Sequence, residues 1–191
     1  MPHENFRAAI EESIATKQRL AAQCLPSIGA LCDLVVATLR GGGKVMLCGN
    51  GGSACDAAHA AGELVGWFEA KKRRAYAAIA LGHDVPTLTA IGNDAGFEHV
   101  FARQVQALGR RGDLLIGIST SASSKNVVLA LQTAKDLGIA TAALTGERRG
   151  PVTELAGVCV QVPSANTARI QESHLLVVHM VCAAAEQALG T

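Results

Sequence analysis

Aromatic residues and charges of either sign are scarce in this sequence. Phe, Trp and Tyr make up 3% of the 191 residues, and charged residues make up 17%, with a net charge of +1. Without a basic surplus, the composition argues against nucleic-acid binding. Hydrophobic residues reach 49%, which excludes a disordered chain and allows a sizeable core. Because Ala, Val, Leu and Gly supply most of that volume, it is typical of buried parallel strands beneath closely packed helices.

The sequence also lacks a recognisable signal sequence and a clear membrane span. Residues 1–4 do not begin the basic and then apolar pattern of a signal sequence. The longest stretch without a charged residue, 155–168, is too short for a span and contains Pro163. The six cysteines form no C-x-x-C pair, and most lie in apolar runs. We therefore expect reduced thiols, a cytoplasmic location and no membrane partner.

Periodicity predicts N-terminal helices followed by an α/β core. Residues 5–39 carry apolar residues at three- and four-residue spacing, and Pro26 is expected to separate two helices there. Beyond Gly43, short apolar runs alternate with amphipathic stretches, which predicts a parallel sheet covered on both faces. We expect one domain over 1–191, with 1–40 used in packing and oligomerisation and 41–191 as the core. The apolar runs lie at 44–48, 76–81, 113–118, 140–145 and 158–162, and a last helix is expected at about 167–189.

Two loops that follow predicted strands have compositions suited to an anion. Residues 49–53 read Gly-Asn-Gly-Gly-Ser, whose glycines allow a ligand to approach the backbone where a helix begins. Residues 119–124 read Ser-Thr-Ser-Ala-Ser-Ser and offer five hydroxyls to phosphate oxygens. Ordinary helix capping is the alternative, but it requires only one or two hydroxyls. Neither loop is a Walker loop or a G-x-G-x-x-G motif, so nucleotide binding has little support.

Two pairs of side chains could act on a ligand or bind a metal. His59 and Glu63 share a face of the helix after the first loop, although a surface ion pair would have the same spacing. Gln171 and His179 lie eight residues apart on the last helix, about 12 Å along its axis. They could reach one metal from opposite ends, or another chain could complete the site. A neutral core histidine is the alternative for His179, because it lies in Val-Val-His-Met-Val.

These segments together resemble the sedoheptulose-7-phosphate isomerases, the phosphoheptose isomerases of the sugar-isomerase (SIS) superfamily. The resemblance runs in register from about residue 40 to the C-terminus, and its motifs are specific to the family. They are Gly-Lys-Val-x-x-Cys-Gly-Asn-Gly-Gly-Ser at 43–53, His59 with Glu63, Ala-Ile-Gly-Asn-Asp at 90–94, Gly-Ile-Ser-Thr-Ser at 117–121 and Arg-Ile-Gln-Glu at 169–172.

The resemblance implies a three-layer αβα sandwich with a five-stranded parallel sheet, the flavodoxin-like SIS fold, with N-terminal helices added. It implies a homotetramer with active sites between subunits. The implied reaction converts sedoheptulose 7-phosphate to D-glycero-D-manno-heptose 7-phosphate, the first step of nucleotide-heptose biosynthesis for lipopolysaccharide. An aldose–ketose isomerase needs a base at carbon and an acid near the carbonyl oxygen.

The resemblance also assigns roles to residues. Glu63 and His179 are the implied catalytic pair. One zinc per site is implied, with His59, Glu63, Gln171 and His179 as its ligands. The implied substrate-binding residues are Asn50, Gly51, Gly52, Ser53, Glu63, Asn93, Asp94, Ser119, Thr120, Ser121, Ser124 and Gln171.

Three departures from the family pattern leave other functions open. Trp67 replaces an Arg, Ala122 replaces the Gly of Ser-Thr-Ser-Gly, and the loop at 71–74 is one residue longer than in many relatives. An isomerase acting on a different heptose phosphate is one alternative. A non-catalytic SIS protein that binds a replication initiator is the other, and the presence of Glu63 and His179 argues against it.

The last helix also bears on assembly. Its residues 175–185 are apolar nearly all round, which is typical of a helix enclosed on more than one side. A partner subunit or the N-terminal helices could provide that cover. We expect the active site to need more than one chain. If one active site took Glu63 and His179 from different chains, a mixture of inactive variants of the two residues would recover some activity.

Overall fold

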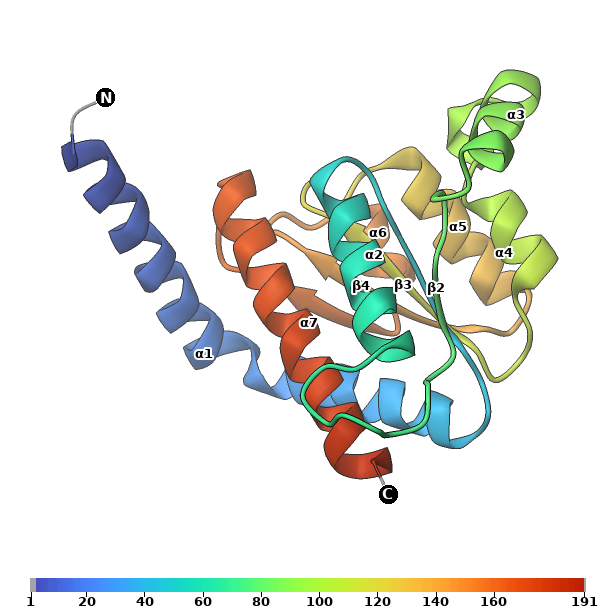
Figure 1. Ribbon diagram of the computed structural model, residues 1–191. Coiled ribbons are helices and arrows are strands. Elements are labelled where there is room, and N and C mark those ends of the chain that lie inside the picture. The colour runs from blue at the N-terminus through green and yellow to red at the C-terminus, as the bar shows by residue number, and fades with distance from the viewer. Residues whose placement is uncertain (1–2, 191) are drawn as a thin grey trace.

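A parallel sheet of five strands, in the order β2-β1-β3-β4-β5, lies between two layers of helices (Figure 1). The computed structural model describes residues 3–190. Every neighbouring pair of strands is parallel, so the expected three-layer α/β fold is confirmed. The strands are β1 (Val45–Gly49), β2 (Ala78–Ala80), β3 (Leu114–Ser119), β4 (Ala140–Thr145) and β5 (Val158–Gln161).

The helices divide between the two faces of the sheet according to the core they contribute to. Helices α1, α2 and α7 pack on one face, and α4, α5 and α6 pack on the other. A single-turn 3-10 helix, η1 (Phe97–His99), follows α3. The α-helices are α1 (His3–Arg40), α2 (Gly52–Val65), α3 (Val85–Ala95), α4 (Ala102–Leu108), α5 (Lys125–Asp136), α6 (Pro151–Leu155) and α7 (Thr167–Leu189).

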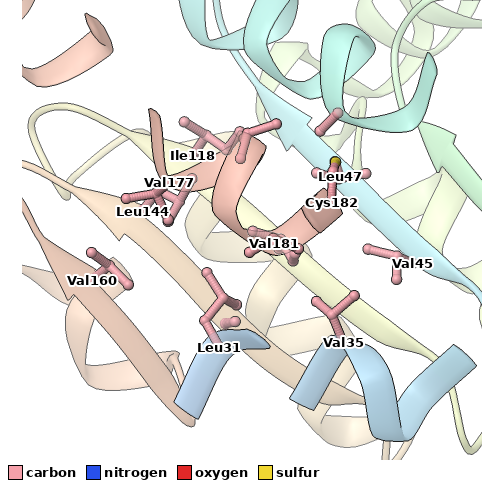
Figure 2. Packing of buried hydrophobic residues seen from close by; sticks show 14 of the residues in the cluster. Leu31, Val35, Val45, Leu47, Ile118, Leu144, Val160, Val177, Val181 and Cys182 are labelled. Carbon is pink, nitrogen blue, oxygen red and sulfur yellow. The ribbon is translucent and has the colours of Figure 1, made fainter. Parts of the chain in front are cut away.

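The central strands β1 and β3 are buried on both faces, and their side chains alternate between two hydrophobic cores. In β1, Val45 and Leu47 face α1, α2 and α7, whereas Met46 and Cys48 face the opposite layer. Figure 2 shows the first of these cores, with Val177 and Val181 of α7 between the sheet and α1. The cover that α7 needs on its second side therefore comes partly from α1 of the same chain.

The expectation of two N-terminal helices is wrong. Residues 3–40 form the single helix α1, with Pro26 inside it. Figure 1 shows that this helix bends, as expected where Pro removes one backbone hydrogen bond and crowds the preceding turn. By length and composition α1 could also cross a membrane, with a window of mean hydropathy 1.7. Its stripe of Leu20, Ile28, Leu31 and Val35 is instead buried in the first core.

The strand order places the two predicted ligand loops beside each other. The chain leaves β1 toward β2 on one side of the sheet and leaves β3 toward β4 on the other. The carboxyl ends of β1 and β3 thus form the point where the strand order reverses, which is the usual ligand position in open α/β sheets. In contrast, α3 stands off the body of the molecule, and none of its described residues is buried (Figure 1).

Candidate active site

The hydroxyls after β3 converge on one another rather than capping the helix that follows. Ser119 Oγ lies 2.9 Å from Ser124 Oγ and 3.5 Å from Ser121 Oγ. Ser124 is the N-cap residue of α5, yet its side chain accepts no capping hydrogen bond within the described chain. The capping alternative therefore fails for this loop. Free N–H groups at the N-terminus of α5 remain available to an anion.

A pair of amides joins the two loops. Asn50 Nδ2 donates to Asn126 Oδ1 at 2.9 Å, and Asn126 Nδ2 donates back to Asn50 Oδ1 at 2.8 Å. Asn126 is buried, whereas Asn50 is half-buried and keeps one amide hydrogen for a ligand. Gly51 has φ +57° and opens α2 without a side-chain cap among the residues described. The loop between β1 and α2 thus presents backbone N–H groups, as expected from its glycines.

Gln171 lies against the first of these loops. A Cβ added at Gly52 would come within 2.5 Å of Gln171 Nε2, so glycine at this position allows the amide to approach. The predicted substrate residues Asn50, Gly51, Gly52 and Gln171 consequently share one end of α2. Ser53, one residue further on, is buried, and its N–H donates to Asn50 O at 3.0 Å.

The predicted acid–base residues meet at the other end of α2. Helices α2 and α7 run side by side in the same direction, so residues advance in step along both (Figure 1). Gly52 faces Gln171, and seven residues later His59 faces His179, with their Nε2 atoms 3.0 Å apart. Glu63, one turn beyond His59, places Oε1 3.5 Å from His59 Nε2. His59, Glu63 and His179 therefore form a cluster within one chain.

Part of this cluster has the spacing of metal ligands. Two imidazole nitrogens bound tetrahedrally to one zinc at 2.0–2.1 Å lie about 3.3 Å apart, close to the separation of His59 and His179. Among the described residues, however, no group of three His, Cys, Asp or Glu side chains is already placed around one point. One turn before His59, Asp56 has a buried oxygen without a hydrogen-bond partner in the described chain. Burial raises the pKa of Asp56, and His59 lowers it to a smaller extent.

The structure separates the two groups of predicted site residues. Gly52 and Glu63 are eleven residues apart in α2, about 16 Å along the axis. Gln171 lies against Gly52 and His179 lies against His59, so the two side chains occupy different levels of α2 in one chain. Within one chain His59 contacts both Glu63 and His179, so this contact does not require two chains, and a site built from more than one chain stays a prediction.

Three other features singled out in the sequence, the Asn93–Asp94 pair, Ala122 and Trp67, can be located in the structure. Asn93 and Asp94 are exposed at the end of α3, where Asn93 Nδ2 donates to Asp94 Oδ1 at 2.8 Å. Ala122 has φ +57° and is fully buried, so the residue that replaces the family glycine does adopt a left-handed conformation. Trp67 is exposed beyond the end of α2.

Two residues, one beside His179 and one in the core under α7, could not be selected from the sequence. Phe68 stacks on His179, with ring centroids 5.4 Å apart and an interplanar angle of 28°. His174 is fully buried, with Nε2 3.2 Å from Thr145 O. Burial lowers the pKa of His174 to about 4, although the hydrogen bond to Thr145 opposes this shift. No motif marks either residue, because their roles depend on which helices become neighbours.

Comparison with known proteins gives a consistent result. The SIS domain family model matches residues 9–146. A phosphoheptose isomerase from Roseiflexus sp. (strain RS-1) is 51% identical over 180 residues, covering 94% of this chain and 91% of the relative. A phosphoheptose isomerase from Rhodospirillum rubrum is 47% identical over 166 residues, covering 87% of this chain and 88% of the relative.

Solved structures agree with these relatives over nearly the whole chain. The structure of a phosphoheptose isomerase from Neisseria gonorrhoeae has a TM-score of 0.91 and 41% identity, covering 97% of this chain and 98% of the other. A phosphoheptose isomerase from Francisella tularensis has a TM-score of 0.93 and 39% identity, covering 98% and 100%. The chain therefore belongs to the phosphoheptose isomerase family of SIS-domain proteins.

Proposed function

We propose that this isomerase converts sedoheptulose 7-phosphate to D-glycero-D-manno-heptose 7-phosphate. The observation that carries the proposal is the meeting of His59, Glu63 and His179 at one end of the α2–α7 pair. A carboxylate and an imidazole are the side-chain types that aldose–ketose isomerisation requires. The names of the related proteins indicate a heptose phosphate as the substrate class.

The reaction moves one proton between neighbouring carbons. A base removes a proton from C1 of the ketose while an acid protonates the C2 carbonyl oxygen, which gives an enediol. A proton is then delivered to C2, and the hydroxyl oxygen on C1 loses its proton to become the aldehyde. Glu63 and His179 supply these acid and base functions between them. Their side chains are partly buried, which limits competition from water at the reacting carbons.

The phosphate of the substrate is assigned to the two loops at the carboxyl ends of β1 and β3. Hydroxyls of Ser119, Ser121 and Ser124 lie together there, at an uncapped helix N-terminus. Such a site donates hydrogen bonds from both hydroxyls and backbone N–H groups, and the helix dipole favours the negative charge. Thr120 and Ser53 border the same two loops.

Zinc is assigned to the imidazole end of the cluster. His59 and His179 would hold it through Nε2, Glu63 would add a carboxylate oxygen, and Gln171 of a second chain would complete the set. Bound there, zinc would supply Lewis-acid polarisation of the sugar oxygens. The spacing of the two imidazoles and the mixture of nitrogen and oxygen donors support this assignment.

The active site is assigned to an interface between subunits of a homotetramer. Phosphate and C2 of an extended heptose phosphate are seven bonds apart, about 9 Å. Gly52 and His59 are about 10 Å apart along α2, and Glu63 reaches back to His59, a length that a fully extended substrate matches. A neighbouring subunit could cover the partly exposed side chains of the cluster and supply Gln171 to it. Exposed Phe6, Ile10 and Ile14 form a stripe along α1 that suits such a contact.

A coupled assay tests the reaction directly. The purified protein is incubated with sedoheptulose 7-phosphate, and the aldose product is consumed by a heptose-7-phosphate kinase with ATP. We expect formation of ADP that depends on both the ketose and this protein. The proposal would be contradicted if a folded, zinc-loaded protein formed no ADP with sedoheptulose 7-phosphate or with any other heptose 7-phosphate. Activity with a different heptose phosphate alone would correct the substrate but keep the reaction type. We place the enzyme in the cytoplasm. We propose that its reaction is the first step toward nucleotide-activated heptose.

A further inference from the structure

The most buried carboxylate on α7 lies outside the proposed catalytic cluster. Glu186 accepts hydrogen bonds from the backbone N–H groups of Phe68, Glu69 and Ala70 at 2.7–3.0 Å. It also accepts a 2.7 Å bond from Arg73 Nε, in an ion pair that is almost fully buried. Burial alone would raise the pKa of Glu186, but these donors outweigh it and lower the pKa to about 2. The carboxylate thus fixes the loop of residues 67–74 to α7.

Arg73 connects the same ion pair to the end of α2. Its Nη2 donates to Glu63 O at 2.7 Å, and its Nη1 donates to Leu64 O at 3.1 Å. Both carbonyls lie in the last turn of α2, where they lack partners within the helix. The guanidinium also lies 4.1 Å from the ring centroid of buried Tyr76. Arg73 is therefore held on several sides while it caps the helix that carries Glu63.

Phe68 connects the loop to His179. Glu186 Oε1 accepts from the N–H of Phe68 at 3.0 Å, and the ring of Phe68 stacks on the imidazole of His179. His59 lies on another side of the same imidazole, with ring centroids 5.2 Å apart. The orientation of His179 thus depends on a ring whose backbone is held by Glu186.

We propose that Glu186 and Arg73 are positioning residues, which set the orientation of Glu63 and His179 through one buried ion pair. The pair contacts the backbone of Glu63 directly and reaches His179 through Phe68. This inference rests on the proposed roles of Glu63 and His179. It adds that the loop of residues 67–74, which contains Trp67 and the longer segment 71–74, supports the catalytic pair.

A second buried carboxylate in the chain provides a matched control. Asp113 accepts from the backbone N–H groups of Lys44 at 2.9 Å and Arg110 at 2.8 Å, and it pairs with the ammonium group of Lys44. Like Glu186, it joins separate segments through backbone amides and one cation. Asp113 precedes β3 and touches neither α2 nor α7 in these contacts. Neutralising it disturbs the fold without reaching the catalytic pair.

The test compares Glu186→Gln with Asp113→Asn in the zinc-loaded, full-length protein. For Glu186→Gln we expect kcat to fall on the order of 10- to 100-fold, since small misplacements of reacting groups carry losses of this size. KM should change by less than about threefold, because the phosphate loops lie at the other end of α2. Asp113→Asn should lower thermal stability but keep kcat for the folded fraction. Phe68→Leu should lower kcat while leaving the ion pair in place. This variant still tests the proposal if Glu186→Gln does not fold.

Two spectroscopic readouts separate positioning from a general loss of stability. The ring of Phe68 should shift the imidazole proton resonances of His179 in the NMR spectrum, and Glu186→Gln should remove that shift. Trp67, the single tryptophan, should show faster fluorescence depolarisation in Glu186→Gln but not in Asp113→Asn.

Wild-type kcat in both Glu186→Gln and Phe68→Leu would overturn the proposal. So would a loss in Glu186→Gln that is explained by the unfolded fraction, with unchanged His179 resonances. A fully active Glu63→Gln would instead show that the proposed catalytic pair is wrong. The two failures are therefore distinguishable.

Discussion

The Nε2 atoms of His59 and His179 lie 3.0 Å apart, although 120 residues separate them in the sequence. The parallel arrangement of α2 and α7 produces this contact, because it places residues in step from Gly52 and Gln171 onward. The same arrangement leaves Gln171 at the phosphate end and His179 at the other. The predicted site residues of one chain therefore lie at two levels of the α2–α7 pair.

Zinc binding should depend on both imidazoles. We expect the protein to bind one zinc per chain, and His59→Ala and His179→Ala each to weaken binding by at least about 10-fold. Metal content after equilibrium dialysis gives the stoichiometry and affinity without relying on activity. His83→Ala is the control, because exposed His83 contacts Ala54 O and lies outside the cluster. Unchanged zinc affinity in His59→Ala would remove the basis for the assigned site.

Mixing experiments should show which residues belong to one chain. Ser121→Asp places a negative charge in the phosphate loop, and Glu63→Gln removes the carboxylate, so each variant alone should be inactive. After subunit exchange, random pairing should restore about a quarter of the sites if each combines two chains. Mixing Glu63→Gln with His179→Ala should restore none, because those residues share a chain. If activity returned on mixing Glu63→Gln with His179→Ala but not on mixing Glu63→Gln with Ser121→Asp, the assignment of these residues to chains would be reversed.

His174 should make stability depend on pH in a defined window. Its pKa falls from an ordinary value of 6.5 to about 4 because the imidazole is buried. Between these values the unfolded chain binds more protons than the folded one, so the free energy of unfolding should decrease as pH falls from about 6.5 to 4. The decrease is at most about 3 kcal/mol from this group. Urea denaturation at pH 7 and pH 4.5 measures it, and His174→Leu should show a smaller difference. An equal difference in that variant would assign the pH dependence to other groups.

Ala122 should tolerate glycine but not a branched side chain. Its left-handed conformation costs about 1 kcal/mol, and glycine relieves this while losing about 0.8 kcal/mol of methyl burial. Ala122→Gly should therefore change the free energy of unfolding by less than about 1 kcal/mol. Ala122→Val should lower it by more than about 2 kcal/mol, through backbone strain and overpacking. Chemical denaturation distinguishes these outcomes, and a stable valine variant would show that the loop adopts another conformation.

Much of the fold could be predicted from local pattern. The apolar runs identify all five strands, and residues 140–145 match β4 at both ends. The helix at 167–189 also matches α7, since an Asn cap and a continuous helical period define it. Pro26 does not divide α1 into two helices, because tertiary packing of α1 on the sheet overcomes the loss of one hydrogen bond.

The candidate site was predictable in its residue types but not in its arrangement. Loop composition identified the converging hydroxyls of Ser119 and Ser124, because the chemistry is local. The distances between groups depend on which helices lie side by side and in which direction, and sequence spacing does not contain this information. For the same reason Phe68, Arg73 and Glu186 carried no signal before α2 and α7 were placed together.

Glu63 and His179 are proposed to transfer a proton between C1 and C2 of a heptose 7-phosphate. NMR of the protein with sedoheptulose 7-phosphate in D₂O measures this directly, by the appearance of the aldose phosphate and the fate of the C1 and C2 hydrogens. We expect aldose formation by the wild type, and formation about 10²–10⁴-fold slower by Glu63→Gln. No aldose phosphate from the wild type, or an equal rate in Glu63→Gln, would contradict this proposal.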